Sequence, residues 1–372
     1  MRLVFVGAGH AHLYSLKRAR RFLQAGCEVV LVSPSHQLNY SGMATGVLSG
    51  RHRPQDATID TAALVESGGG EYTEGLVKGI SPDRKTLHLA SGETLDYDLV
   101  SFCTGSSTVV PRVMGDMGER VIPVKPVENL LLLRERLLGG AGSLLFVGGG
   151  AAGCEVAANA AALVGGDGIT ILESADRLLL SAPERAGRLM RRHLESVGVT
   201  VKSGVEISST ADAGPNGKPS FFLSDGGEVE ADLVVAATGV GAPGLFAGSN
   251  LSVGRGGGML VDGCLRSVDD ARVFGGGDSI SFGERGLPGF GVYAIRQGPV
   301  LFDNLLAAAT GGEMSSFVPQ RRNLYVLGLG DGTGLGIYGG AVWKGRSAGL
   351  LKDYIDNKFM REYRGSVPPE AE

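Results

Sequence analysis

Apolar and polar positions follow the same order in two stretches of the chain. Each stretch begins with a short apolar strand, at 3–6 and at 144–147, which leads into a glycine-containing loop. A segment with apolar residues at helical spacing follows, and a second apolar strand comes at 28–32 and at 169–172. A strand, a loop, a helix and a further strand are the parts of a βαβ unit. The pattern therefore predicts two such units.

The two stretches also end alike. Segments at 86–97 and at 220–230 alternate apolar and polar residues as β-hairpins do. Each is followed by an Asp, an apolar strand and a Thr-Gly pair. The matched order indicates an internal duplication. The pairs are Thr104-Gly105 in the first stretch and Thr238-Gly239 in the second.

The remaining elements complete the predicted architecture. Helices are predicted at 126–138, 181–197 and 292–309, and a short strand at 272–274. The pattern predicts an α/β fold with two units, one for each βαβ start, and a small C-terminal segment.

Composition and charge narrow the class of protein. The 61 glycines among 372 residues show no Gly-X-Y period, so we expect them in turns and at close backbone approaches. The net charge is −4 without runs of like charge, which gives no support to nucleic-acid binding. The sequence has no pattern of a signal peptide, and we expect a cytoplasmic protein. Widely spaced cysteines predict reduced thiols and no metal site. These are Cys27, Cys103, Cys154 and Cys264.

The second glycine loop has the spacing of a dinucleotide-binding site. Gly148, Gly150 and Gly153 lie between a strand and a helix, and Glu173 ends the next strand. Such glycines let the backbone approach a pyrophosphate, and the carboxylate accepts hydrogen bonds from ribose hydroxyls and repels a 2′-phosphate. The sequence therefore predicts NAD(H) rather than NADP(H), although Arg177 nearby could soften this preference. The alternative for Glu173 is an ordinary solvated acid.

The first glycine loop departs from this spacing. Gly7 and Gly9 are present, but His12 replaces the third glycine and Ser33 replaces the strand-end acid. His12 could bond a phosphate or fill the core, and both interpretations stay open. His10, at the start of the same helix, is a further candidate contact to the cofactor. Without the acid, the ribose in this site needs another partner.

A third element concerns the ligand of the first loop. Gly277 and Asp278 follow the strand at 272–274 and a run of glycines. In a flavoprotein with two dinucleotide sites, an Asp here accepts a hydrogen bond from the ribityl chain of FAD. The alternative is a plain Asp-capped turn.

The order of two glycine loops, two Asp…Thr-Gly strands and a Gly-Asp element resembles the pyridine nucleotide-disulfide oxidoreductase superfamily. The resemblance covers essentially the whole chain. The segments at 9–13, 40–43, 124–126, 288–298 and 352–360 are similar to its NADH-dehydrogenase-like branch. More narrowly, they resemble the flavoprotein module that some bacteria carry fused to selenide, water dikinase.

The resemblance implies an α/β fold with two Rossmann-like FAD/NAD(P)-binding domains, each with three layers of the ββα type, and a small C-terminal α+β domain. The expected domains are 1–112 together with 241–312, which hold FAD, then 113–240, which holds NADH, and last 313–372. The resemblance also implies an oxidoreductase that accepts hydride from NADH onto flavin N5 and passes electrons to a quinone or another small acceptor. Glu155 stands where this family places a carboxylate near the nicotinamide, or else is an acid paired at the domain interface. Lys125 is a candidate for a positive charge near the flavin, and its alternative is a structural role.

Several residues differ from the patterns of the superfamily, and these differences argue against some of its activities. The region 39–50 has no cysteine, so we expect no redox disulfide. The four cysteines do not converge as sulfide:quinone oxidoreductases require. Type II NADH:quinone oxidoreductases carry two glutamines at positions that are Val292 and Arg296 here, which weakens quinone reduction. Gln297 stands one position along, and a shift of register could restore the site.

The C-terminal segment 344–364 is rich in basic residues and has apolar residues at helical spacing, among them Tyr354 and Phe359. Such a stripe could rest on an anionic membrane surface, on the inner face of the membrane, or pack on its own domain or on a second subunit of a homodimer. The alternative function is that of an FAD- and NADH-binding redox-sensing or accessory protein with little turnover, linked to selenium metabolism.

Overall fold

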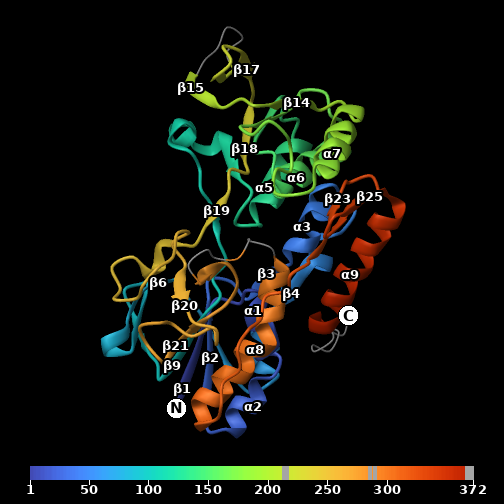
Figure 1. Ribbon diagram of the computed structural model, residues 1–372. Coiled ribbons are helices and arrows are strands. Elements are labelled where there is room, and N and C mark those ends of the chain that lie inside the picture. The colour runs from blue at the N-terminus through green and yellow to red at the C-terminus, as the bar shows by residue number, and fades with distance from the viewer. Residues whose placement is uncertain (212–217, 284–286, 288–290, 365–372) are drawn as a thin grey trace.

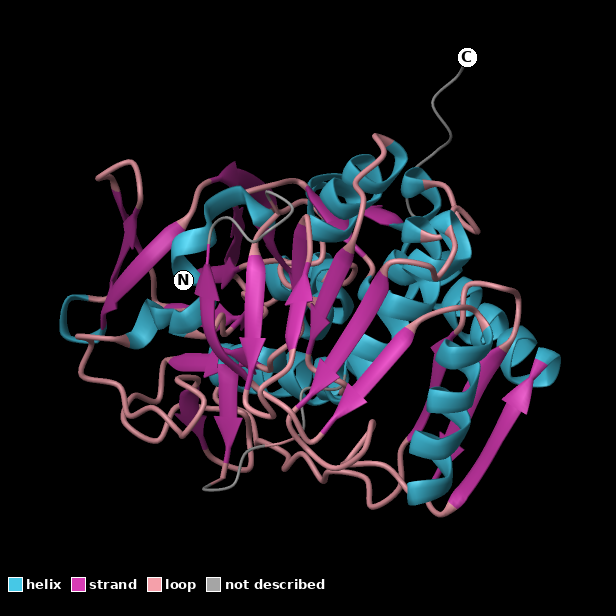
Figure 2. Ribbon diagram, turned by 90° about the horizontal axis from the view of Figure 1, so that it is seen from above, coloured by secondary structure: helices cyan, strands magenta, loops and turns pink. Residues whose placement is uncertain are grey.

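The computed structural model describes residues 1–211, 218–283, 287 and 291–364. It contains two halves, each built on a parallel sheet, and a C-terminal domain (Figure 1). In Figure 2 the strands gather in sheets and helices lie against them. The predicted α/β fold with two Rossmann-like domains and a small C-terminal α+β domain is confirmed.

The first half has a parallel sheet with the strand order β21-β9-β1-β2-β5. The apolar runs at 3–6 and 28–32 are its neighbouring strands β1 and β2, as predicted. The strands are β1 (Arg2–Val6), β2 (Glu28–Ser33), β5 (Glu71–Glu74), β9 (Leu99–Phe102) and β21 (Val273–Gly275). The helices of this half are α1 (His10–Leu16), α2 (Ala19–Gln24), α3 (Ser41–Leu48), α4 (Thr61–Glu66) and α8 (Gly291–Thr310).

Each face of this sheet is covered by a different layer. Phe5 and Leu31 pack in one cluster with residues of the helices, whereas Val4 and Val30 pack in another with an antiparallel sheet. Successive side chains of a strand point to opposite faces, so one apolar run serves both layers. The antiparallel sheet is formed by β6 (Val77–Ser81), β7 (Thr86–Leu89) and β8 (Thr94–Asp96).

Short elements complete the first half. Two small sheets pair β3 (Gln37–Asn39) with β4 (Thr58–Asp60) and β20 (Met259–Val261) with β22 (Ile280–Phe282). The 3-10 helices along the chain are η1 (Pro54–Ala57), η2 (Pro82–Arg84), η3 (Arg112–Arg120), η4 (Gly244–Phe246) and η5 (Gly277–Ser279).

The second half repeats the same plan with the strand order β11-β18-β12-β13-β14. Phe146 faces one cluster and its neighbour Leu145 faces the other. The parallel strands are β11 (Val121–Pro123), β12 (Leu144–Val147), β13 (Ile169–Glu173), β14 (Thr200–Ser203) and β18 (Leu233–Ala236). The helices are α5 (Asn129–Leu138), α6 (Ala151–Val164) and α7 (Glu184–Ser196), and the antiparallel layer is β15 (Ile207–Ala211), β16 (Ser220–Leu223) and β17 (Glu228–Glu230).

Two short strands lie where the chain crosses between the halves. β10 (Ser107–Thr108) pairs with β19 (Val240–Gly241) in antiparallel register, close to the predicted domain limits at 112 and 240. The limits of the domains stay predictions.

The C-terminal domain packs a helix on a small sheet. Its sheet consists of β23 (Leu324–Gly328), β24 (Gly334–Tyr338) and β25 (Ala341–Gly345), and the helix is α9 (Arg346–Arg364). The apolar residues that the sequence placed on one stripe of α9 do not share one environment. Phe359 is buried, whereas Tyr354 and Ile355 are exposed. In the described part of the chain, we find no helix with the length and apolar character needed to cross a membrane.

Candidate functional site

The first glycine loop lies between β1 and α1. Gly7 has a φ of +79°, and a Cβ on it would lie 2.6 Å from the carbonyl oxygen of Cys103. A Cβ on Gly9 would lie 2.5 Å from the Sγ of Cys103. Side chains are thus excluded at these two positions, and bare backbone is typical of a loop that a dinucleotide pyrophosphate approaches.

His12 supports this loop from inside the core. Its Nδ1 lies 2.6 Å from the carbonyl oxygen of Gly7, and its Nε2 lies 2.8 Å from the Oγ of Ser101. The side chain is fully buried, and burial lowers its pKa to about 4. Both ring nitrogens are used by the protein, so the expectation that His12 contacts a phosphate is wrong. The alternative, a core residue, describes this ring.

His10 lies at the start of α1 among aromatic rings. Its ring centroid is 5.5 Å from that of Tyr40 and 5.8 Å from that of Phe359. Burial lowers the pKa of His10 to about 4, so the imidazole is neutral at pH 7. Its Nε2 has no hydrogen-bond partner among the described residues. A cofactor contact of His10 stays a prediction.

Ser33 ends β2 and Thr104 follows β9, two strands of the first sheet that lie on either side of β1. Ser33 is buried, and its carbonyl accepts the N–H of Gly75 at 3.0 Å. Thr104 donates its N–H to the Oγ of Ser279 at 2.6 Å, and Gly105 follows with a φ of +73°. The strand ends are thus fixed by contacts within the protein, and their contacts to a cofactor stay predictions.

A polar cluster joins the two halves at Asp278. The Nζ of Lys125 lies 2.7 Å from the Oδ2 of Asp278, and the Oγ of Ser106 donates to the same oxygen at 2.6 Å. Lys125 also donates to Ser106 at 2.8 Å. Burial alone would raise the pKa of Asp278, but the Lys125 ammonium and these hydrogen bonds hold it below its usual value. Asp278 is therefore an anion at pH 7.

Asp278 lines a cavity of about 350 Å³. Gln297 lines it too, and its Oε1 accepts the N–H of Gly277 at 2.7 Å. Gly277 has a φ of +66°, so the amide of Gln297 holds a turn that only glycine adopts easily. Val292 is partly buried and Arg296 is exposed, whereas Gln297 lies toward the cavity.

The second glycine loop joins β12 to α6. Gly148 has a φ of +110°, and a Cβ on Gly153 would collide with the carbonyl oxygen of Gly148. Gly150 is the N-cap of α6, and a Cβ there would meet nothing within 4 Å. Gly153 is thus required for the close packing of helix and strand, whereas the space beside Gly150 is open to a ligand.

Glu173 reaches from the end of β13 back to this loop. Its Oε2 accepts the N–H of Gly149 at 2.6 Å, and its Oε1 accepts the N–H of Ala175 at 2.8 Å. The carboxylate therefore lies beside the glycine loop, on the side where the next strand ends. Its bond to a ribose stays a prediction.

Thr238 and Gly239 fix the crossing between the halves. The Oγ1 of Thr238 donates to the carbonyl of Val109 at 2.6 Å, and the N–H of Val109 donates to the carbonyl of Gly239 at 3.0 Å. Gly239 has a φ of +100°. Their role as cofactor contacts stays a prediction.

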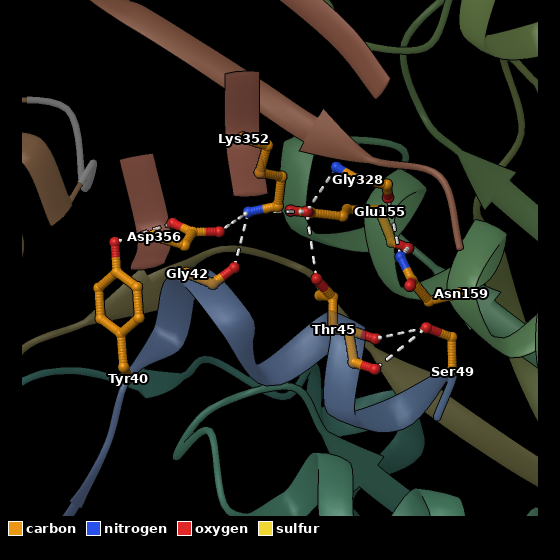
Figure 3. A network of polar contacts seen from close by, with 10 residues as sticks. Tyr40, Gly42, Thr45, Ser49, Glu155, Asn159, Gly328, Lys352 and Asp356 are labelled. Atoms are coloured by element: carbon orange, nitrogen blue, oxygen red, sulfur yellow. Dashed lines mark hydrogen bonds and ion pairs between the residues drawn. The ribbon is translucent and has the colours of Figure 1, made fainter. Parts of the chain in front are cut away.

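Glu155, in the first turns of α6, joins three parts of the molecule (Figure 3). Its Oε1 accepts the N–H of Gly328 in β23 at 2.8 Å and the Oγ1–H of Thr45 in α3 at 3.1 Å. The Nζ of Lys352 in α9 lies 3.7 Å from the same oxygen. This is the arrangement of an acid paired at the domain interface. A role beside the nicotinamide stays a prediction.

Lys352 extends this network toward the first half. Its Nζ donates to the carbonyl of Gly42 at 2.6 Å and lies 3.1 Å from the Oδ2 of Asp356, whose Oδ1 accepts from the Tyr40 hydroxyl at 3.0 Å (Figure 3). Burial raises the pKa of Glu155, and Lys352 opposes this shift. Burial would lower the pKa of Lys352, but Glu155 and Asp356 together raise it. One buried cation thus serves two carboxylates.

Sequence reasoning did not assign roles to Ser106, Tyr40, Lys352 or Asp356. Lys352 and Asp356 are one helical turn apart, and this spacing of opposite charges is a signal that could have indicated the pair. Ser106 and Tyr40 carry no such signal, because their partners are distant in the sequence. Part of the motif at 288–298 lies outside the described residues, namely 288–290.

The cysteines are buried or partly buried free thiols in the described structure. Burial raises the pKa of Cys103 to about 12 and also raises that of Cys154. Neither thiol is a thiolate at neutral pH, so neither is a reactive nucleophile.

Comparison with known proteins places this geometry in a family. The family model described as pyridine nucleotide-disulphide oxidoreductase matches residues 1–298. The chain belongs to this family. Its members are NAD(H)-dependent flavoprotein oxidoreductases that bind FAD, which confirms the predicted class of enzyme and its two cofactors.

Two curated relatives show the degree of similarity. A rubredoxin-NAD(+) reductase of Alcanivorax borkumensis is 27% identical over 269 residues, which are 71% of this chain and 69% of the relative. The ferredoxin-NAD(+) reductase component of a biphenyl dioxygenase system of Paraburkholderia xenovorans is 27% identical over 279 residues, 74% of this chain and 66% of the relative. The chain is also similar to the nitrite reductase (NADH) large subunit of Escherichia coli, but the matched part is only 30% of the length of that protein.

Solved structures show the same fold. The sulfide:quinone oxidoreductase of Aquifex aeolicus aligns with a TM-score of 0.79 and 15% identity, over 99% of this chain and 93% of that one. An NAD-dependent persulfide reductase from A. fulgidus aligns with a TM-score of 0.76 and 23% identity, over 90% and 63%.

Proposed function

We propose that this protein holds FAD in its first half, oxidises NADH bound in its second half, and passes the electrons to a quinone or another small acceptor without an enzyme disulfide. The observation that carries the proposal is the presence, in one chain, of two strand–loop–helix units, each with at least two glycines at which a Cβ would collide with neighbouring atoms. Bound FAD would supply the two-electron acceptor for the hydride of NADH.

The residues of the first half suit FAD. The loop at Gly7 and Gly9 offers bare backbone, and the cavity of about 350 Å³ brings Asp278 and Gln297 to one surface. In the proposed complex, Asp278 accepts from hydroxyls of the ribityl chain. Lys125 keeps Asp278 ionised and places a positive charge near the flavin.

The residues of the second half suit NADH. Glu173 is a carboxylate beside the glycine loop, bonded to the N–H of Gly149. Ribose hydroxyls would donate to it, whereas a 2′-phosphate would be repelled. On this account FAD is bound mainly by 1–112 and 241–312, NADH by 113–240, and the segment from 313 forms a cap.

The acceptor defines the finer part of the proposal. Gln297 lies toward the cavity, as a glutamine that contacts a quinone beside the flavin would have to do. Two of the relatives named above are a rubredoxin-NAD(+) reductase and a ferredoxin-NAD(+) reductase component, and such small proteins are the second class of acceptor to be tested. Leu350 and Tyr354 are exposed on α9, and on this proposal they could contact an acceptor protein or a membrane surface.

The acceptor can be found by an assay of NADH oxidation under anaerobic conditions. The FAD-loaded protein would be mixed with NADH and, in separate reactions, with a water-soluble quinone, a one-electron dye and a reducible iron–sulfur protein. We expect sustained turnover with the quinone. Turnover with the iron–sulfur protein alone would replace the quinone in the proposal, and absence of turnover with every acceptor would favour a redox-sensing role.

A further inference from the structure

The side chain of Arg177 is engaged by the backbone of its own loop. Its Nη1 donates to the carbonyl of Leu179 at 3.0 Å, and its Nη2 donates to those of Leu180 at 2.8 Å and Ala182 at 3.0 Å. A fourth, longer bond of 3.4 Å goes to Leu178. A planar guanidinium can bind several carbonyls at once because its donors point outward in a fixed fork.

This loop has a conformation that needs support. Leu179 has a φ of +53°, in the left-handed region where the Cβ of an L-residue lies too close to the following carbonyl oxygen. The N–H of Ala182 donates to the carbonyl of Leu179 at 2.8 Å. Arg177 donates to carbonyls on both sides of this turn. These bonds stabilise a backbone conformation that is unfavourable by itself.

The same loop grips the second glycine loop. Leu179 donates its N–H to the carbonyl of Gly149 at 2.9 Å. Leu178 is buried, and a Cβ on Gly149 would collide with its Cδ2. On its other side Gly149 donates to Glu173. A chain of contacts therefore leads from Arg177 through the loop to the residue that carries the predicted ribose carboxylate.

We propose that Arg177 is a positioning residue, which holds the loop 177–182 in the form that binds the adenosine end of NADH and does not itself bind a 2′-phosphate. The inference rests on the proposed function of the second glycine loop. It reverses the expectation that Arg177 softens the preference for NAD(H), because the guanidinium is already shared among backbone carbonyls.

The charges of the loop point the same way. Glu173 and Asp176 are carboxylates, and Asp176 is exposed. A 2′-phosphate placed here would meet these acids, and Arg177 could turn toward it only by releasing the turn at Leu179. On this proposal the preference for NAD(H) has two causes. Glu173 repels the 2′-phosphate of NADP(H), and the guanidinium of Arg177 is bound to loop carbonyls and so does not attract that phosphate.

The test compares Arg177→Ala and Arg177→Lys with the wild type. Lysine keeps the charge but has a single nitrogen, which cannot reach all of these carbonyls. Binding of NAD⁺ and of NADP⁺ to the oxidised, FAD-loaded protein would be measured by calorimetry, so that no turnover intervenes. Arg188→Ala is the matched control, because Arg188 lies on α7 and pairs only with Glu184 in the described structure.

We expect both Arg177 variants to bind NAD⁺ roughly tenfold more weakly than the wild type, with no gain for NADP⁺ and with the FAD content unchanged. Two outcomes overturn the inference. One is unchanged binding of NAD⁺ in Arg177→Ala. The other is loss of NADP⁺ binding in Arg177→Ala that Arg177→Lys restores, because charge alone would then be sufficient and Arg177 would be a phosphate ligand.

A measurement on the wild type covers the case in which the variants do not fold. Hydrogen exchange of the FAD-loaded protein without nucleotide should show slow exchange at the amides of Leu179 and Ala182, which are both bonded in the loop. Fast exchange at these amides would overturn the inference. If the wild type binds no NAD⁺ at all, the proposed function fails, and that result is distinct from either outcome above.

Discussion

The Nζ of Lys352 lies 3.7 Å from the Oε1 of Glu155, which ties the C-terminal helix α9 to the helix that begins at the second glycine loop. Both side chains are largely buried, with 16% and 15% of their surface exposed. Because Lys352 also lies 3.1 Å from Asp356, its removal would leave two carboxylates without a cation in a region of low polarity.

Replacement of Lys352 by methionine should destabilise the protein by about 3 kcal/mol, the usual cost of removing one partner of a buried ion pair. The measurement is urea denaturation of the FAD-loaded protein at pH 7.5. Lys358→Met, at an exposed position of the same helix, is the control and should change the free energy of unfolding by less than about 0.5 kcal/mol. Equal stability of the two variants would show that Lys352 does not stabilise the buried carboxylates of Glu155 and Asp356.

Glu155→Gln should change how stability depends on pH. Burial raises the pKa of Glu155 in the native state, so the native protein holds this proton more tightly than the unfolded chain does. The resulting contribution to stability is fully present below the unfolded pKa of about 4.3. It is lost as the pH rises through the native pKa. Glutamine does not titrate. The free energy of unfolding of Glu155→Gln relative to the wild type should therefore increase from pH 4.5 to pH 8. A constant or decreasing difference would contradict the raised pKa.

Gly153→Ala and Gly150→Ala should separate packing from ligand binding. Alanine at 153 would collide with the Gly148 carbonyl, so we expect a lower melting temperature and loss of NAD⁺ binding with FAD retained. Alanine at 150 meets nothing within 4 Å, so the melting temperature should stay within about 2 °C of the wild type. NAD⁺ binding should nevertheless weaken, because the methyl group would stand where the pyrophosphate approaches. Normal binding by Gly150→Ala would place the nucleotide elsewhere.

Glu173→Ala should reduce discrimination between the two nucleotides. The variant lacks the acceptor for the ribose hydroxyls, so NAD⁺ should bind roughly tenfold more weakly, while NADP⁺ should bind as well as before or better. Calorimetry on the oxidised protein measures both. Asp176→Ala is the control, because Asp176 is an exposed acid of the same loop. If Asp176→Ala relaxed discrimination as much as Glu173→Ala, general charge rather than the strand-end position would set the preference.

Much of the fold could be predicted because its signals are local. The apolar runs that became β1 and β12, the glycines with positive φ at Gly7 and Gly148, and the proline before α7 each act within a few residues. The duplicated order then made the two halves recognisable. The pairing of Lys125 with Asp278 was not predicted, since it depends on how the two halves meet.

Other parts of the site depend on packing that local sequence does not encode. The sequence left His12 between a phosphate ligand and a core residue, and only its contacts with Gly7 and Ser101 decide for the core. Arg177 shows the same limit, because its position near Glu173 in the sequence indicated that it could soften the preference for NAD(H), whereas in the structure its guanidinium donates to carbonyls of its own loop. In both cases the burial and the partners of one side chain decide its role.

The central claim is that NADH bound by the second half reduces a flavin held by the first. The most direct test is an anaerobic stopped-flow experiment in which the FAD-loaded protein is mixed with NADH or with NADPH and the flavin absorbance near 450 nm is followed. We predict rapid bleaching with NADH and much slower bleaching with NADPH. Protein that retains FAD but is reduced by neither nucleotide would contradict the account.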